Sequence, residues 1–593
     1  MKGFFRETPF PDQPAHVHPE RERRVKRDPA RRRGLLLAAG FGVAFAVLGA
    51  RMGALALVPP GEERARVSAS SPGERGQIVD RHGRLMAGTL PTWAVALRPR
   101  MTAEAGGLSP DDLTALKEIF PNLDQNRLRY LVNTGKTAFT YVERRASPRQ
   151  WKEARDLGII GLEAVQRNDR VFPPGRVAAH VLGGVNIDNK GRSGIEKGLE
   201  ERLTDPDAMG TPLALSLDMR VQNALHLTMS EAVAEFAALG AAGLVMDVRT
   251  GELLAMVSLP DFDPNDPPPL PTDGADPSLS PLFNRVSQGI YELGSVFKLV
   301  TAAAAIDSGV VDIDTRVDAS APIRRGGFTI KDYLGKNRVM TVEEMIRYSS
   351  NIGAVRVAEM MGVPRHKAFL EKLDMDDRVP LAELPAPERS RGQLPAKWRS
   401  ANAATVAYGH GLAVTPLHIA AGIASIANHG CKVTPTLLRR SAPPPCERVV
   451  SDDTSGKMRA LMRVVGKHSS GRSANIAGYE IGGKTGTAYK VKMTGGYDFD
   501  KRFNTFVALW PTTEPQYLMV LSIDDPKLLD GSGKLPLAGR TAAPAAGRAI
   551  ERIAPLLGLA PTDRFRPTGQ FVDEVTEGGA LPISLPPLEE EAQ

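Results

Sequence analysis

One apolar segment near the start of the chain constrains its topology more than any other feature. Residues 34–50 carry no charge, and after Arg51 the apolar run resumes to Val58. A run of about 25 residues is long enough to span a bilayer with some tilt. A dense basic cluster at residues 21–33 precedes it. By the positive-inside rule the N-terminus then stays in the cytoplasm, and everything after Pro59 is exported.

A cleaved signal peptide is the alternative interpretation of this segment, because Ala54-Leu55-Ala56 has the small residues of a cleavage site. The apolar run exceeds the roughly 7–15 residues usual in a signal peptide, and a long polar segment precedes it. We therefore expect a retained anchor that passes once through the plasma (inner) membrane. The N-terminus would be cytoplasmic and the main part of the chain periplasmic.

Several domains are expected, because 593 residues are too many for one hydrophobic core. Shifts in composition and pattern mark the boundaries. Strand and helix signals alternate in the long C-terminal zone, which predicts a mixed α+β fold. The predicted parts are a basic cytoplasmic tail (1–33), a membrane helix (34–58), a module of mixed pattern (61–206), a large domain (211–559) and a disordered tail rich in Pro, Gly and Glu (560–593).

Composition argues against nucleic-acid binding and against a metal centre. The net charge is +7, but much of the excess lies in the first 33 residues, and no basic patch is interleaved with aromatic residues. The two cysteines, Cys431 and Cys446, have no neighbouring histidines or cysteines at metal-ligand spacing. Export permits a disulfide between them, and two free thiols are an equally good interpretation.

A serine and a lysine stand at the start of a predicted helix in residues 291–309, YELGSVFKLVTAAAAIDSG. The Ala-rich run after Ser295 favours a helix, whose N-terminus stabilises developing negative charge. Positions i and i+3 share one helix face, so Lys298 can touch the Ser295 hydroxyl. A buried lysine loses its charge readily and could take the serine proton. The alternative is a capping serine beside a surface lysine, because Ser-x-x-Lys also arises by chance.

A second motif, Ser349 and Asn351, precedes the helical pattern IGAVRVAEMM. Its hydroxyl and amide could share the pocket of the serine and lysine. The signal is weak alone, because Ser-x-Asn also occurs at residues 400–402 and 473–475, where caps or turns are the simpler interpretation.

A third motif lies in residues 481–487, IGGKTGT, ahead of β-prone sequence. Its glycines predict a strand whose backbone lies close to a ligand. Lys484 supplies positive charge there, and Thr485 and Thr487 supply hydrogen-bond donors that suit a carboxylate.

The three motifs in this order resemble those of class A β-lactamases and penicillin-binding proteins. The wider chain resembles the class B penicillin-binding proteins, and among them the division-specific members. RGQIVDRHGRLMA at residues 75–87 resembles the segment just outside the membrane, and residues 172–196 resemble the non-catalytic module. YGHGLAVTPL at residues 408–417 resembles a stretch between the second and third motifs. The resemblance covers roughly residues 75–559. One departure is Leu293, where the family often has proline.

This resemblance implies a pedestal (dimerisation) module at 61–206 and a serine β-lactamase-like transpeptidase domain at 211–559, with an antiparallel sheet flanked by helices. It implies a D,D-transpeptidase that crosslinks peptidoglycan at the division septum and is the target of β-lactams. The implied roles are nucleophile for Ser295, base for Lys298, substrate positioning and proton relay for Ser349 and Asn351, electrostatic support for Lys484, and substrate binding for Thr485, Gly486 and Thr487. The backbone N–H groups of Ser295 and Thr487 would form the oxyanion hole.

The resemblance implies no metal or organic cofactor. The implied partners are stem peptides that end in D-Ala–D-Ala, β-lactams, and membrane proteins of the division machinery such as the polymerase FtsW. An elongation-specific transpeptidase would share all three motifs. A β-lactamase or penicillin sensor would not account for residues 61–206. A catalytically idle scaffold would not need all three motifs intact.

Overall fold

The computed structural model describes residues 39–43, 45–47, 49, 74–272, 274, 276–333, 335–492 and 495–561. The chain divides into two compact units, Met1–Ser71 and Pro72–Gln593. Those residues of the first unit that are described are helical and exposed. Within the described ranges, no helix is both long enough and apolar enough to cross a bilayer. The predicted tail at 1–33, most of the predicted membrane segment 34–58, and residues 562–593 lie outside the described residues.

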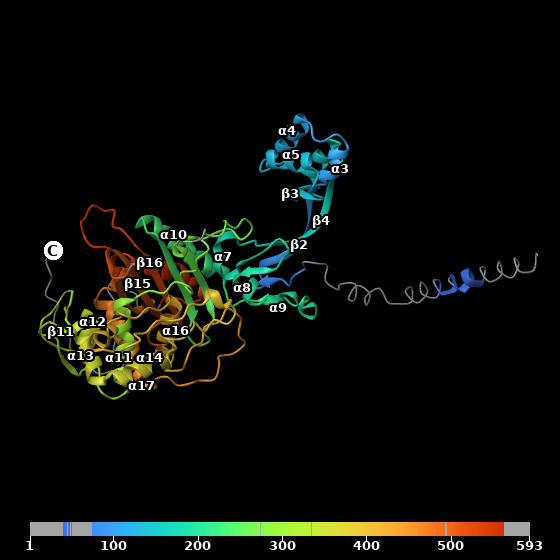
Figure 1. Ribbon diagram of the computed structural model, residues 1–593. Helices are drawn as coiled ribbons and strands as arrows, with labels where there is room; N and C mark the ends of the chain where they lie inside the picture. The colour runs from blue at the N-terminus through green and yellow to red at the C-terminus, as the bar shows by residue number, and fades with distance from the viewer. Residues whose placement is uncertain are drawn as a thin grey trace, which may run out of the picture. The chain divides into compact units, whose positions relative to one another are not determined.

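An antiparallel five-stranded sheet forms the centre of the C-terminal part, where Figure 1 labels β15 and β16. Its strand order is β14–β15–β16–β8–β9. Arg249-Thr250-Gly251 forms the turn of a hairpin, because β8 and β9 pair antiparallel on either side of it. The predicted strand at IGGKTGT is also present as β14, which forms one edge of the sheet. The strands are β8 (Gly240–Asp247), β9 (Leu253–Leu259), β14 (Gly482–Val491), β15 (Tyr497–Trp510) and β16 (Tyr517–Asp524).

Both faces of this sheet are covered by helices, and the inner strands β8 and β16 are buried along their whole length. Along β16, Leu518 and Val520 belong to one hydrophobic core, while Met519 and Leu521 belong to another. Side chains alternate between faces along a strand, which explains the division. The predicted mixed fold, with an antiparallel sheet flanked by helices, is therefore confirmed. The first core includes α11 (Phe297–Asp307), α13 (Asn351–Met361), α14 (Val363–Lys372), α16 (Pro416–Ala427) and α17 (Asp452–His468), and the second α10 (Met219–Glu235) and α18 (Ala542–Ile553).

A smaller module precedes this domain and has its own sheet. Its long strand β2 pairs with β1, β3 and β4, and β1 pairs in parallel with β7. Leu116 and Phe120 are buried in a separate small core against Val95 and Leu97 of β2. The elements are β1 (Ile78–Val79), β2 (Leu85–Leu97), α3 (Pro99–Glu104), α4 (Pro110–Ile119), α5 (Gln125–Thr134), β3 (Thr140–Ala146), α6 (Pro148–Asp156), β4 (Leu162–Val171), α7 (Ala179–Leu182), α8 (Gly194–Gly198), α9 (Glu200–Thr204) and β7 (Leu213–Ala214).

Two stretches that the sequence singled out, 75–87 and 172–196, meet in a buried ion-pair network of this module. Arg75 Nε lies 2.8 Å from Glu196 Oε2, and Arg170 Nε lies 2.7 Å from Glu196 Oε1. These three side chains are at most 1% exposed. A buried charge needs such a partner, because an unpaired one is costly in a low-dielectric interior. The network therefore ties the start of the module to α8.

Cys431 and Cys446 form a disulfide across a sequence separation of 15 residues. A backbone bridge between Cys431 and Arg448 runs beside it. The disulfide closes the proline-rich loop SAPPPC, and it decides between the two interpretations that the sequence left open.

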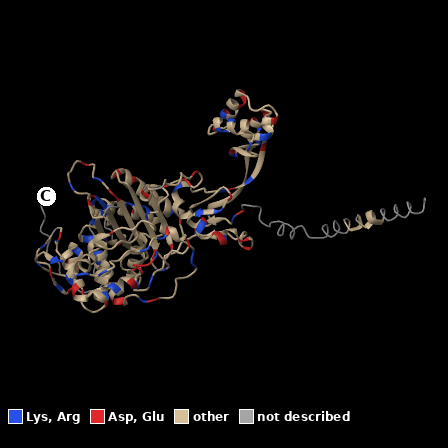
Figure 2. Cartoon of the chain, viewed as in Figure 1, with Lys and Arg blue, Asp and Glu red and all other residues tan. Residues whose placement is uncertain are grey.

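Figure 2 shows Lys and Arg interspersed with Asp and Glu over the described ribbon, with no continuous face of one sign in this view.

Candidate active site

Ser295 lies in a tight 3₁₀ turn, η4 (Gly294–Val296), that leads directly into α11. Gly294 has φ +53°, and a methyl group at this position would lie 2.9 Å from the carbonyl oxygen of Thr487. Its N–H donates to the carbonyl of Gly409 at 3.2 Å. A side chain at position 294 would be strained and would collide with β14. Glycine therefore lets this turn, named the nucleophile turn after the role predicted for Ser295, rest directly against the strand that carries Lys484.

The amine of Lys298 is buried beside the Ser295 hydroxyl. Its Nζ lies 2.9 Å from Ser295 Oγ, 3.1 Å from Ser349 Oγ and 2.5 Å from the Ser349 carbonyl oxygen. Burial, followed by the charge of Lys484, holds the pKa of Lys298 well below its ordinary value. A neutral amine has two N–H donors for the two Ser349 oxygens and one lone pair for the Ser295 O–H. The geometry and the lowered pKa together allow Lys298 to act as a base toward Ser295.

Ser349 ends α12 (Val342–Tyr348) in a left-handed conformation, with φ +57°. Such a conformation is unusual for a residue with a side chain, and this one turns the carbonyl and the hydroxyl toward Lys298. Asn351 begins α13, and its amide donates to the Lys331 carbonyl at 3.0 Å. Among the described contacts, no hydrogen bond joins Asn351 to Ser295, Lys298 or Lys484.

Lys484 enters the same cluster from β14. Its Nζ lies 3.0 Å from Ser349 Oγ and 3.1 Å from the Thr485 carbonyl oxygen. The side chain is fully buried, and burial lowers the pKa of Lys484 to about 7. Two residues on, a methyl group at Gly486 would lie 2.1 Å from the Leu293 carbonyl oxygen. Only glycine lets this strand approach the nucleophile turn so closely.

The two threonines of β14 have hydrogen-bond partners beside the cluster. Thr485 Oγ1 lies 2.5 Å from Ser470 Oγ. Thr487 Oγ1 accepts from the N–H of Ala538 at 3.0 Å. Because this bond uses a lone pair of Thr487, its hydroxyl hydrogen remains able to donate to a ligand.

Sequence reasoning missed Glu292, which lies three residues before Ser295. Its carboxylate accepts from His410 Nδ1 at 2.9 Å, from Gly411 N at 2.9 Å and from the Tyr497 hydroxyl at 3.0 Å. Glu292 therefore joins the nucleophile turn to β15 and to the segment YGHG. The sequence flagged YGHG, but nothing in it linked Glu292 to Tyr497, which is 205 residues away.

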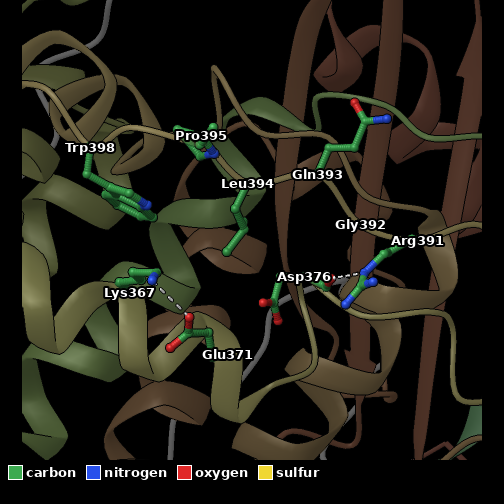
Figure 3. Close-up of a pocket in the computed structure, with 10 residues that line it drawn as sticks. Lys367, Glu371, Asp376, Arg391, Gly392, Gln393, Leu394, Pro395 and Trp398 are labelled. Carbon is green, nitrogen blue, oxygen red and sulfur yellow. Dashed lines mark hydrogen bonds and ion pairs between the residues drawn. The ribbon is translucent and has the colours of Figure 1, made fainter.

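A cavity of about 520 Å³ lies elsewhere in the same domain (Figure 3). Lys367 and Glu371 of α14, which form an ion pair at 3.2 Å, line one side of it. Arg391, Leu394 and Trp398 belong to the segment that lines the other side. None of the residues of the three motifs contributes to its lining, so this cavity is separate from the serine and lysine cluster.

Comparisons with known proteins agree with this geometry. The profile of the penicillin binding protein transpeptidase domain matches residues 241–547. That of the penicillin-binding protein dimerisation domain matches residues 70–209. The chain is 33% identical over 554 residues to the probable peptidoglycan D,D-transpeptidase FtsI of Caulobacter vibrioides, covering 91% of both chains. It is 29% identical over 512 residues to the peptidoglycan D,D-transpeptidase FtsI of Escherichia coli K12, covering 82% of this chain and 85% of the relative.

The fold also has solved counterparts. One is penicillin binding protein 3 of Mycobacterium tuberculosis in complex with aztreonam, with a TM-score of 0.61 and 24% sequence identity. That match covers 81% of this chain and 96% of the other. At this identity the likeness shows the shared fold.

Proposed function

The chain belongs to the class B penicillin-binding proteins, and we propose that it is the peptidoglycan D,D-transpeptidase of the division septum. The enzyme joins neighbouring stem peptides through an acyl-enzyme on Ser295, and β-lactams acylate the same serine. One observation carries the proposal: the buried amine of Lys298 lies 2.9 Å from the Ser295 hydroxyl. A nucleophile and its base within hydrogen-bond reach are the defining requirement of serine acyl transfer.

The first step is attack of Ser295 Oγ on the carbonyl of the penultimate D-Ala. Lys298 takes the hydroxyl proton as the new C–O bond forms. The oxyanion of the tetrahedral intermediate accepts hydrogen bonds from the backbone N–H groups of Ser295 and Thr487. The contact of Gly294 with the backbone of Thr487 supports this pairing, because it holds the two segments together. Loss of one such donor costs about 10²–10³ in rate in other acyl-transfer enzymes.

Collapse of the intermediate breaks the C–N bond and releases D-Ala. The leaving amine needs a proton, and the Ser349 hydroxyl can pass it on, because Ser349 Oγ lies within hydrogen-bond distance of both lysines. The amine of a neighbouring stem peptide then attacks the acyl-enzyme, and Ser295 recovers its proton. The energy comes from the D-Ala–D-Ala bond, so no nucleoside triphosphate is consumed.

Different protonation states suit the two lysines to different roles. Lys298 is subject to burial and to the charge of Lys484, and its pKa is lowered by both, whereas burial alone lowers the pKa of Lys484 to about 7. Lys298 is the amine assigned to give up its proton, because it lies beside the Ser295 hydroxyl and next to a second cation. When Lys298 is neutral, it acts as the base, and Lys484 remains a cation that attracts the carboxylate of the substrate. The hydroxyls of Thr485 and Thr487 hydrogen-bond this carboxylate, while Asn351 positions the peptide.

Residues 34–58 anchor the enzyme in the inner membrane, with the N-terminus in the cytoplasm and the transpeptidase domain in the periplasm. The basic cluster at 21–33 sets this orientation. Residues 61–206 form the pedestal, residues 211–559 the catalytic domain and residues 560–593 a tail. The membrane segment and the pedestal contact other division proteins such as FtsW. The disulfide between Cys431 and Cys446 suits the oxidising periplasm.

Depletion of the native protein in cells that express either wild type or Ser295→Ala tests the proposal. Wild type should restore septation and bind fluorescent penicillin. Ser295→Ala should do neither, and the cells should grow as filaments. Normal septation with Ser295→Ala would favour a catalytically idle scaffold, and rounded cells in place of filaments would favour an elongation enzyme.

A further inference from the structure

The turn that carries Ser349 is fastened by a carboxylate outside the three motifs. Asp332 lies in the connection between β12 (Phe328–Ile330) and β13 (Val339–Thr341). Its Oδ2 accepts from the Ser350 hydroxyl at 2.7 Å, and its Oδ1 accepts from the N–H of Ile352 at 2.9 Å. Two bonds from one carboxylate thus hold the residues that directly follow Ser349.

A neighbouring bond strengthens this attachment. The Asn351 amide donates to the Lys331 carbonyl, so residues 350, 351 and 352 all bond to the pair Lys331–Asp332. The Ser350 hydroxyl also accepts from the N–H of Gly353 and so caps α13. A left-handed serine persists only when its surroundings fix it. Asp332 is the side chain that fixes this turn, and the turn presents both oxygens of Ser349 to Lys298.

Charge gives Asp332 a second role. Lys298 and Lys484 both lie within hydrogen-bond distance of Ser349 Oγ. Among the described groups, the charges of Lys484 and Asp332 shift the pKa of Lys298 in opposite directions. The charge of Asp332 raises the pKa of Lys298, against the lowering by burial and by Lys484. A general base with too low a pKa accepts protons poorly, so this opposing effect keeps Lys298 useful as a base.

We propose that Asp332 is a positioning residue of the transpeptidase, which holds the Ser349 turn and balances the charge of the two buried lysines. This inference rests on the proposed function, since it assumes that Lys298 serves Ser295 as base. Asp332 itself does not touch the reacting atoms. It holds the conformation of the Ser349 turn through its bonds to Ser350 and Ile352, and its charge acts on the pKa of Lys298.

The test measures the second-order rate of acylation by benzylpenicillin against pH, on the full chain in detergent. Asp332→Asn keeps an oxygen acceptor and removes the charge, so the pKa of Lys298 falls further. We expect the acid limb of the profile to move to lower pH and the plateau to fall about tenfold, because the base is weaker. Asp332→Glu restores the charge and should return the acid limb toward its original position.

Two other variants separate the effect of the Asp332 charge from the effect of its hydrogen bonds. Ser350→Ala keeps the carboxylate and loses one of its bonds, so the rate should fall while the acid limb stays in place. Asp318→Asn removes an exposed carboxylate at the end of β10 (Arg316–Asp318) and should leave the profile unchanged. An Asp332→Asn enzyme with an unmoved acid limb, or Asp332→Glu matching Asp332→Asn, would overturn the proposal. Absence of any wild-type acylation would instead contradict the proposed function.

Discussion

Lys298 and Lys484 meet at one oxygen atom, because their Nζ atoms lie 3.1 and 3.0 Å from the hydroxyl of Ser349. The two lysines are 186 positions apart in the sequence, and one comes from a helix while the other comes from a strand. Both are fully buried, and two adjacent buried cations repel each other. The site therefore favours a state with one neutral and one charged amine.

Replacement of Lys484 by glutamine tests this relationship. Without the charge of Lys484, the pKa of Lys298 rises, so the acid limb of benzylpenicillin acylation should move to higher pH. The alkaline limb, which we expect near pH 7 from the pKa of Lys484, should disappear. The maximal rate should fall by about 10²-fold, as for loss of one electrostatic donor. An unchanged pH profile would contradict the coupling of the two lysines.

Gly486→Ala should slow acylation strongly without unfolding the domain. The new methyl group would lie 2.1 Å from the Leu293 carbonyl oxygen, so either β14 or the nucleophile turn must move. Displacement by about 1 Å can cost about 10²-fold in rate. Gly456→Ala in α17 is the matched control, because the nearest atom to its methyl group would be 3.9 Å away. Equal acylation rates for the two variants would show that the close approach is unimportant.

Glu292→Gln and Tyr497→Phe should each slow acylation about tenfold by loosening the nucleophile turn. Glu292→Gln weakens the bonds to β15 and to the YGHG segment, whereas Tyr497→Phe removes only the bond to β15. Tyr489→Phe removes a hydroxyl from the same hairpin, and it should leave the rate unaltered. Stopped-flow labelling with a fluorescent penicillin gives the rates. A slow Tyr489→Phe enzyme beside a normal Tyr497→Phe enzyme would refute this role of Glu292.

Glu196→Gln should destabilise the pedestal by about 3–5 kcal/mol, because it leaves Arg170 without its buried counter-charge and Arg75 with only a partly exposed carboxylate partner. Glu163→Gln breaks an exposed pair with Arg98 and should cost about 0–1 kcal/mol. Thermal unfolding of the two variants measures the difference. Equal midpoints would mean that the buried network contributes little to stability.

Local patterns predicted the elements of this fold well. The Ala-rich run after Ser295 predicted α11, and the glycine motif at residues 481–487 predicted β14, because each carries a strong local signal. The buried network of Arg75, Arg170 and Glu196 was not predictable, since nothing local indicates which distant charges pair. The disulfide was left open for the same reason. The membrane segment stays a prediction.

The candidate site also has a part that could be predicted from the sequence and a part that could not. Spacing along one helix placed Lys298 beside Ser295, and the distance of 2.9 Å agrees with that reasoning. The Ser349 motif was a weak signal alone, and the order of the three motifs, through the family resemblance, indicated that Ser349 and Lys484 join them. Glu292 and Asp332 escaped notice because single carboxylates carry no spacing signal. Their importance lies in contacts to Tyr497 and Ser350 that only the folded chain creates.

Mass spectrometry of the benzylpenicillin adduct tests the central claim most directly. The full-length enzyme is incubated with the drug, digested, and sequenced by tandem fragmentation. We predict one penicilloyl group, located on Ser295, that is absent from Ser295→Ala and forms far more slowly in Lys298→Ala. An adduct on any other residue, or one that persists in Ser295→Ala, would contradict the assignment of Ser295 as the nucleophile.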